Sequence, residues 1–217
     1  TLNLMLDYGL TQHSIEANPA RMLKPKDFVA SAKHSRDRAL SLPELRTLWC
    51  ALDQATQTRK GIAKTSTLSI ITATAIKILI LTGARRGEVA GMRWDELDLE
   101  AGTWTLPSNR TKNRKQHVIY LGKLALGLLG TMKPLSGDTP FVFDTGRNTG
   151  HIHTDSLTTA INRLKKSAPL NELKPFTIHD LRRSAATAGG EHRKGKPHVI
   201  EHMLNHQPLN KLIAIYQ

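Results

Sequence analysis

A histidine and an arginine stand three residues apart in the polar segment 177–183, at His179 and Arg182. If this segment is helical, the spacing is about one turn, so both side chains face one target. An imidazole can move a proton near neutral pH, and a guanidinium binds phosphate or carboxylate through paired donors. The pair alone is a weak signal, because an ordinary solvated helix face shows the same spacing. Its meaning therefore depends on the groups that meet it.

Two cationic sites precede this pair in the chain. Arg85 follows Gly83 at an expected helix boundary, and Glu88 lies one turn further on, where a carboxylate can hold a guanidinium. Lys112 lies at the tip of an expected hairpin with three further cations, Arg110, Arg114 and Lys115. Each site has a plain alternative, a salt-bridged surface helix for the first and a solvated basic turn for the second. A basic finger that enters a nucleic-acid groove is the functional interpretation of the turn.

Two more candidate groups follow the pair near the end of the sequence. His206 comes after Leu204-Asn205 in a turn-like context, and Tyr216 ends the apolar run 212–216. Taken alone, Tyr216 is an aromatic side chain on an apolar helix face.

The composition predicts a polyanionic partner. Among 217 residues, Lys and Arg number 31 and Asp and Glu number 18, which gives a net charge of +13, and the hydrophobic content of 39% is enough for a core. Nucleic acid is the first candidate partner and an anionic membrane surface the second.

The single cysteine and the longest apolar run predict a protein of the reducing cytoplasm. Cys50 has no intramolecular partner for a disulfide, and its apolar neighbours indicate core packing. The run Leu68 to Leu81 contains Lys77 and falls short of the roughly 20 residues of a membrane span, so a buried helix is expected there.

The elements that position these groups predict an α+β fold that is mainly α-helical. Ser41-Leu42-Pro43-Glu44 has the pattern of a capping box, which begins a helix through Leu52. Strand patterns at 97–99, 103–106 and 117–121 predict a small antiparallel three-stranded sheet with the basic turn at one tip. Further helices are expected over 1–10, 68–81, 84–92, 124–132 and 154–166.

Five motifs, in this order, resemble the signature of the tyrosine recombinases. They are Thr82-Gly83-Ala84-Arg85-Arg86-Gly87-Glu88, Thr111-Lys112-Asn113, His179-Asp180-Leu181-Arg182, Leu204-Asn205-His206 and Tyr216. The chain is most similar to the integrases of prophages and genomic islands. The resemblance implies the tyrosine-recombinase catalytic fold over 41–217, the end of a truncated core-binding domain over 1–23, and a basic connector over 24–40.

The chain departs from the family pattern at two places. Asn205 stands where the family more often has Gly, which alters a turn. Family members also continue past the tyrosine into a tail that often docks on a neighbouring subunit, whereas only Gln217 follows Tyr216 here.

The resemblance implies DNA cleavage through a 3′-phosphotyrosyl intermediate, with six catalytic residues. Tyr216 attacks the phosphorus and Lys112 protonates the leaving oxygen, while His179 assists proton transfer at the nucleophile. Arg85, Arg182 and His206 bind the phosphate. Glu88 orients Arg85, and contacts to the DNA backbone are expected from Arg110, Arg114, Lys115 and Arg183.

The resemblance also implies the partners. They are double-stranded DNA attachment sites, a homo-tetramer on synapsed DNA that is a monomer alone, and accessory proteins for DNA bending and excision. The expected location is the bacterial cytoplasm, associated with the nucleoid and not with a membrane. No metal and no cofactor is expected, because two arginines can neutralise the phosphate.

Three alternatives remain open from the sequence. His198-Val199-Ile200-Glu201-His202 fits the pattern of inverted zinc proteases, but no acidic residue follows His202 as a further ligand. A non-catalytic DNA-binding relative explains the charge but not the presence of all six residues. A type IB topoisomerase shares the cleavage chemistry and nicks and rejoins one strand.

Overall fold

The computed structural model describes residues 2–22, 37–57, 68–146, 150–192 and 203–205. The chain divides into two compact units, 1–37 and 38–217, and this division falls inside the predicted connector. In the first unit, α1 (Leu2–Thr11) confirms the expected helix, and a 3-10 turn spans Pro19–Met22. The side chain of Asn18 joins them by donating to Asp7 Oδ1 at 2.7 Å. None of the residues of α1 is buried.

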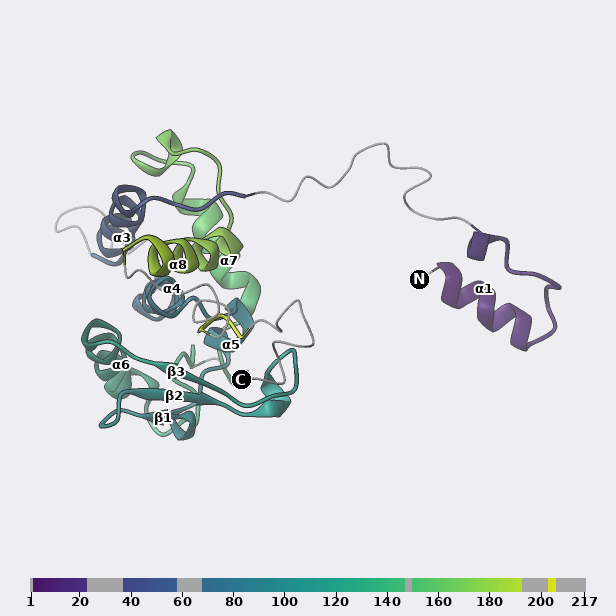
Figure 1. Cartoon of the computed structure of the whole chain (residues 1–217), viewed down its shortest axis with the longest axis horizontal. Helices are drawn as coiled ribbons and strands as arrows, with labels where there is room; N and C mark the ends of the chain where they lie inside the picture. Colours follow the sequence, from purple (N-terminus) through teal and green to yellow (C-terminus); the bar gives the residue numbers. More distant parts are fainter. Residues whose placement is uncertain (1, 23–36, 58–67, 147–149, 193–202, 206–217) are drawn as a thin grey trace. The chain divides into compact units, whose positions relative to one another are not determined.

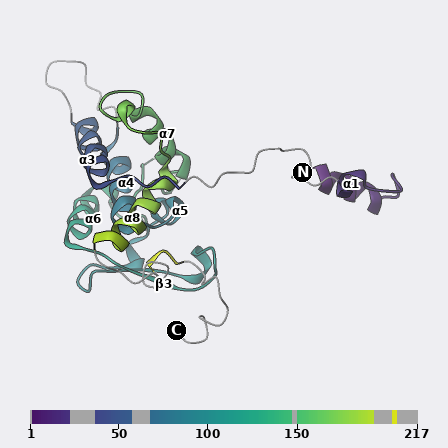
Figure 2. The ribbon, with the colours of Figure 1, turned by 45° about the horizontal axis from the view of Figure 1, so that its top comes forward.

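The second unit is built around α4 (Ile70–Thr82), the helix predicted from the longest apolar run. Eight consecutive residues, Thr72 to Leu79, are buried, so every face of this helix is covered. Figures 1 and 2 show α4 among the other helices, and it packs against α3 (Leu42–Thr56), α5 (Arg86–Ala90), α6 (Lys123–Ser136), α7 (Thr154–Leu164) and α8 (Ile178–His192). Within the described part of the chain, no helix has both the length and the apolar character of a membrane span.

Helix α3 begins as its sequence predicts and corrects one expectation. Ser41 and Glu44 form a full capping box at its first turn. Its buried residues recur at helical spacing, at Leu48, Ala51, Leu52 and Ala55. The prediction that Cys50 packs in the core is wrong, because the thiol is exposed. Cys50 lies two residues from Leu48 and from Leu52, about 200° around the helix from each, and therefore faces away from the buried side.

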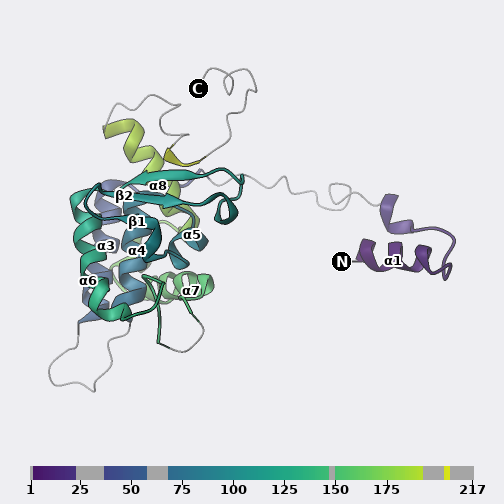
Figure 3. The same cartoon turned by 90° about the horizontal axis from the view of Figure 1, so that it is seen from below.

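The three-stranded antiparallel sheet is confirmed, with the strand order β1-β2-β3. It consists of β1 (Leu97–Asp98), β2 (Thr103–Leu106) and β3 (His117–Tyr120), with Trp104 of β2 paired to Ile119 of β3. In Figure 1 the sheet lies on the opposite side of α4 from α3, α7 and α8. The segment between β2 and β3 extends beyond α5, as Figure 3 shows, and it carries Lys112.

Several helices end elsewhere than the sequence predicts. Helix α3 continues four residues past the expected end at Leu52, to Thr56, and α5 ends at Ala90, two residues early. Helix α6 was expected over 124–132 but continues to Ser136 through Pro134. Proline lacks an amide hydrogen, yet Pro134 lies in the last turn, where losing one bond need not end a helix. Helix α7 is confirmed and stops at Leu164, two residues before the expected end.

Candidate active site

Helix α8 carries His179 and Arg182, and its first turn is fixed by a buried carboxylate. Asp180 Oδ2 accepts hydrogen bonds from the main-chain nitrogen and the hydroxyl of Thr177, both at 2.8 Å. These bonds satisfy donors at the helix start, which gives the predicted helix its N-terminus. His179 is exposed in this turn, whereas Arg182, one turn later, is only 5% exposed. At the same end of α8, the side chain of His179 is thus at the surface and that of Arg182 is buried.

Arg182 is oriented by two main-chain carbonyl groups. Its Nη1 donates to the carbonyl oxygen of Gly83 at 2.5 Å, and its Nη2 donates to that of Leu204. Burial is the main cause that lowers the pKa of Arg182 to about 10, and the neighbouring charge of Arg85 lowers it further. The guanidinium remains charged at neutral pH and ties α8 to the end of α4 and to the segment 203–205.

Gly83 explains how α4 delivers its carbonyl group to Arg182. The residue caps α4 with a left-handed conformation (φ 64°), which favours glycine. A Cβ atom at this position would lie 3.1 Å from Ala185 Cβ and 3.2 Å from Leu204 Cδ2. Both the conformation and the close packing therefore require glycine at the junction of α4, α8 and Leu204.

Arg85 begins α5 and is held by Glu88 in two ways. Arg85 Nη1 donates to Glu88 Oε1 at 2.8 Å, and the Arg85 main-chain nitrogen donates to Oε2 at the same distance. Glu88 is buried, while the side chain of Arg85 keeps 29% of its surface exposed. Arg85 Nη2 also lies 3.4 Å from the carbonyl oxygen of Asn205, to which it donates. The guanidinium thus has a fixed position and an accessible surface.

The short segment 203–205 gathers groups from four parts of the fold. Its three carbonyl groups face His117 Nε2 of β3 (3.2 Å from Met203 O), Arg182 of α8 and Arg85 at the N-cap of α5. The side chain of Asn205 accepts a hydrogen bond from Asn113, in the turn between β2 and β3, at 2.5 Å. Neither the contact of His117 with Met203 nor that of Asn113 with Asn205 was expected from the sequence. The one available signal was an Asn in place of the usual Gly at position 205.

The conformation of Asn205 accounts for that departure from the family pattern. Its φ angle of 51° lies in the left-handed region, where Gly is favoured and Asn is the best tolerated of the other residues. Asn therefore keeps the turn that Gly makes in the family and adds a side chain to it.

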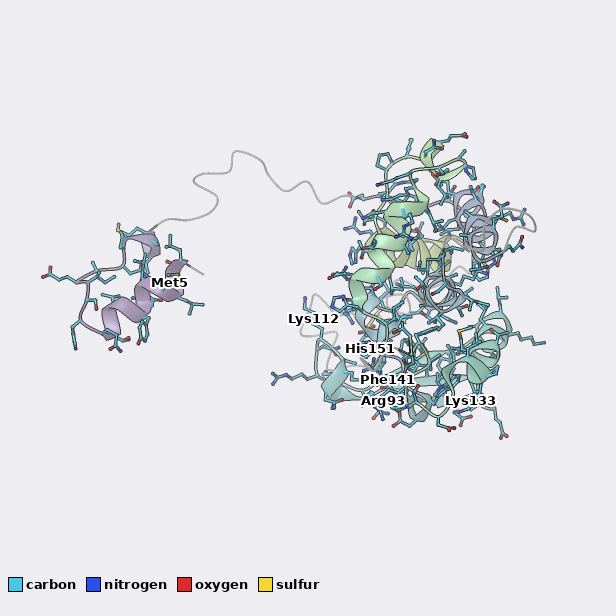
Figure 4. The ribbon with its side chains drawn as sticks, turned by 180° about the vertical axis from the view of Figure 1, so that it is seen from behind. Met5, Arg93, Lys112, Lys133, Phe141 and His151 are labelled. Atoms are coloured by element: carbon cyan, nitrogen blue, oxygen red, sulfur yellow. The ribbon has the colours of Figure 1, made fainter. Side chains whose placement is uncertain are left out.

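Lys112 is exposed at the outer end of the hairpin, as Figure 4 shows. Its turn is braced internally, because the buried Thr111 donates from Oγ1 to the carbonyl oxygen of Lys115 at 2.7 Å. Asn113, the next residue, carries the bond to Asn205. The turn that presents Lys112 is thereby connected to the segment that contacts both arginines.

The four predicted DNA contacts have different surroundings. Arg110 faces inward, where it pairs with the buried Glu96 and donates to the carbonyl oxygen of Glu88 at 2.9 Å. It thereby fixes the base of the hairpin to α5. Arg183 is partly buried, 3.7 Å from Asp180 Oδ1. Arg114 and Lys115 are exposed beside Lys112.

The environment of His179 disfavours its protonated form. Desolvation, followed by the positive charges of Arg183 and Arg182, holds the pKa of His179 below its ordinary value of 6.5. The more distant charge of Arg85 acts in the same direction, and Asp180 opposes it. The imidazole is therefore neutral at pH 7 and able to accept a proton.

His206 and Tyr216 lie outside the described residues, as do the histidines of the zinc-protease pattern at 198–202. Position 205 is described, and His206 follows it directly in the chain. Among the described residues, no group of three or more His, Cys, Asp or Glu side chains is placed to hold a metal ion.

Solved structures share this fold. XerA recombinase matches with a TM-score of 0.63 at 22% identity, over 91% of this chain and 64% of that one. A lambda integrase dimer bound to a COC′ core site matches with a TM-score of 0.65 at 17% identity, over 95% of this chain and 69% of that one. The predicted tyrosine-recombinase catalytic fold is confirmed.

Sequence comparison defines the family. The phage integrase family matches residues 52–217, and this chain belongs to it. The prophage integrase IntA of Escherichia coli (strain K12) is 35% identical over 153 residues, which cover 70% of this chain and 36% of IntA. The prophage integrase IntZ of the same strain is 32% identical over 160 residues, or 74% of this chain and 38% of IntZ. The chain thus spans little more than a third of the length of these two relatives.

Proposed function

We propose that this chain is the catalytic part of a site-specific DNA recombinase that integrates or excises a mobile element. The observation that supports this function best is the grouping of cations around the segment 203–205. Arg85 and Arg182 donate to neighbouring carbonyl groups there, and the turn of Lys112 is bonded to the same segment. Membership of the phage integrase family gives this grouping its chemical context.

Each residue in the proposed reaction has one task. The hydroxyl oxygen of Tyr216 attacks the phosphorus, a P–O bond to tyrosine forms, and the bond to the 5′ oxygen breaks. His179 takes the proton of the tyrosine, and Lys112 gives a proton to the leaving 5′ oxygen. Rejoining runs these steps backwards.

Charge stabilisation falls to the two arginines and one histidine. Arg85 and Arg182 neutralise the non-bridging oxygens as the phosphorus becomes five-coordinate, and His206 donates a hydrogen bond to one of them. Glu88 holds Arg85 in place through the two contacts described above. Because these cations are part of the fold, the proposed reaction needs no metal.

The proposed partner is a double-stranded attachment site. Arg114, Lys115 and Arg183 contact its phosphates, with Arg110 positioned at the hairpin base, so binding weakens as salt rises. We propose a tetramer on synapsed DNA, in line with the solved lambda integrase tetramer bound to a Holliday junction, and a monomer without DNA. Accessory proteins that bend DNA or favour excision, and action on the bacterial nucleoid in the cytoplasm, belong to the same proposal.

Trapping the covalent intermediate tests this function. The purified protein is incubated with duplexes whose core is randomised and whose scissile strand is nicked just downstream, so that the released fragment diffuses away. Covalent complexes are separated on a denaturing gel, and their DNA is sequenced. We expect an enriched core sequence and a covalent band that is absent in Tyr216→Phe.

Three outcomes count against the proposal. No adduct with any core sequence points to a DNA-binding relative without catalysis. An adduct that forms equally in Tyr216→Phe removes the assigned nucleophile. Relaxation of supercoiled DNA with no preferred core and no exchange between two duplexes favours the topoisomerase alternative.

A further inference from the structure

Two asparagine side chains connect the turn of Lys112 to the segment that precedes His206. Asn113 Nδ2 donates to Asn205 Oδ1 at 2.5 Å, and Asn113 Oδ1 accepts from the main-chain nitrogen of Lys115 at 3.3 Å. Asn113 therefore bonds to its own turn through one amide atom and to Asn205 through the other. Because Lys112 is the preceding residue, this contact limits where its side chain can reach.

Asn205 stands between the proposed proton donor and the phosphate-binding arginines. Its main-chain carbonyl accepts from Arg85, and the preceding carbonyl, of Leu204, accepts from Arg182. Its side chain binds the Lys112 turn. If the turn shifts relative to the arginines, one of the hydrogen bonds of Asn205 must therefore stretch or break.

Stability alone does not explain an asparagine at this position. Glycine adopts the left-handed conformation of residue 205 more readily. Asn205 Nδ2 is also buried without an acceptor among the described residues, which costs free energy that glycine would not incur. The one hydrogen bond of the described structure that needs this side chain is the contact with Asn113.

We propose that the hydrogen bond between Asn113 and Asn205 is a latch that positions Lys112 for proton donation, with both asparagines as positioning residues. The inference rests on the proposed function. As the bond from phosphorus to the 5′ oxygen breaks, Lys112 transfers its proton to that oxygen, and the latch keeps the turn close enough for the transfer. The contacts of His117 with Met203 and of Arg110 with Glu88 lie at the base of the hairpin and leave its tip without this restraint.

Replacing the leaving group of the substrate distinguishes a variant that misplaces Lys112 from one that slows cleavage in another way. The nicked duplex recovered in the trapping experiment is prepared with its normal 5′ bridging oxygen and with sulfur at that atom. A thiolate leaves without a proton, so cleavage of the sulfur substrate does not require the general acid. Lys112→Ala is the reference variant. Its cleavage rate should fall strongly on the oxygen substrate and little on the sulfur substrate.

The variants are Asn113→Ala, Asn205→Gly and their double, with Asn109→Ala as the matched control. Asn109 is an exposed asparagine of the same segment between β2 and β3, and its side chain makes no hydrogen bond within the described structure. We expect both single variants to cleave the oxygen substrate about 10–100-fold more slowly and the sulfur substrate at the wild-type rate. The double variant should be no slower than the slower single variant, because both changes remove the same bond.

Equal slowing of both substrates overturns the inference, since it places the defect at the phosphate or the nucleophile. Equal slowing by Asn109→Ala overturns it as well. If the wild type forms no adduct, the proposed function fails, and hydrogen exchange of the free protein tests the latch separately. Faster exchange at residues 112–115 in Asn113→Ala and Asn205→Gly, but not in Asn109→Ala, supports the latch, and unchanged exchange rejects it.

Discussion

The two arginines proposed to bind phosphate and the turn that carries Lys112 are held in the molecule by different means. Arg182 is buried and bonded to two carbonyl groups, and Arg85 is fixed by the buried Glu88. Lys112 is exposed on a turn whose described bond to the rest of the site is one contact between asparagine side chains. Groups that stabilise developing charge gain most from a position set in advance, so a rigid support suits them. The proposed proton donor, Lys112, has to reach one atom of the substrate, and its exposed position on a turn leaves the side chain accessible.

The largest effect is expected at Arg182. Arg182→Ala removes a donor pair from the proposed phosphate site and takes the described partner from the carbonyl groups of Gly83 and Leu204. Cleavage should therefore fall by about 10²–10³-fold and stability by about 1–3 kcal/mol. Arg182→Lys keeps the charge but not the fork, and should show the loss of rate with a smaller loss of stability. Single-turnover cleavage and thermal unfolding measure the two effects.

Arg86→Ala is the matched control for that change. Arg86 lies beside the site in sequence but pairs at the surface, 3.3 Å from Asp155 Oδ1 and 2.8 Å from Thr158 Oγ1. Both rate and stability should stay close to wild type. Equal losses in Arg86→Ala and Arg182→Ala would remove the distinction between a buried phosphate-binding arginine and a surface arginine.

Lys112→Ala should affect rate without affecting stability. Loss of the proposed general acid is expected to slow cleavage by about 10²-fold, while the melting temperature stays unchanged because the side chain is exposed. The same two measurements apply. If Lys112→Ala lowered the melting temperature as far as Arg182→Ala does, Lys112 would be part of the stable structure, as Arg182 is, and the difference between the two regions would not hold.

Gly83→Ala tests the main-chain support of Arg182, whose guanidinium donates to the carbonyl group of Gly83. A left-handed alanine costs about 1–2 kcal/mol, and the added Cβ crowds Ala185 and Leu204, so a loss of stability of at least this size is expected in chemical denaturation. Gly130→Ala in α6 is the control, since a Cβ there meets nothing within 4 Å. It should stabilise the helix by about 0.5–1 kcal/mol. Similar effects at both positions would show that Gly83 is not needed at the junction.

The smallest effect concerns the titration of His179. Its pKa lies below 6.5, and Arg183 is the largest electrostatic cause, so Arg183→Gln should move the midpoint upward in an NMR titration. Because folding disfavours the protonated imidazole, its contribution to stability is present above pH 6.5 and is lost as pH falls toward the folded-state pKa. An unchanged midpoint in Arg183→Gln rules out this electrostatic cause.

The local elements of the fold were predictable because their signals lie in adjacent residues. The capping box at Ser41, the largely apolar helix before Gly83 and the alternation around Trp104 each depend on spacing within about one element. Cys50 was misassigned for the same reason. Its neighbours are apolar, and only the angular position on α3 shows that it faces away from the core.

The sequence indicated which residues form the candidate site better than it indicated how they contact one another. Motif order suggested which residues belong together, but the bonds from Arg85 and Arg182 go to main-chain carbonyl groups, which carry no sequence signal. The contact between Asn113 and Asn205 spans 92 positions of the chain, so no local pattern announces it. Arg110 shows the converse, since a basic segment gave no sign that one of its arginines turns inward to Glu96.

Identification of the amino acid that carries the DNA is the most direct test of Tyr216 as the nucleophile. The trapped covalent complex is digested with protease and nuclease, and the peptide that retains a nucleotide is sequenced by mass spectrometry. We expect a 3′-phosphate ester on Tyr216. A nucleotide on any other residue, such as the exposed Tyr120, would contradict it.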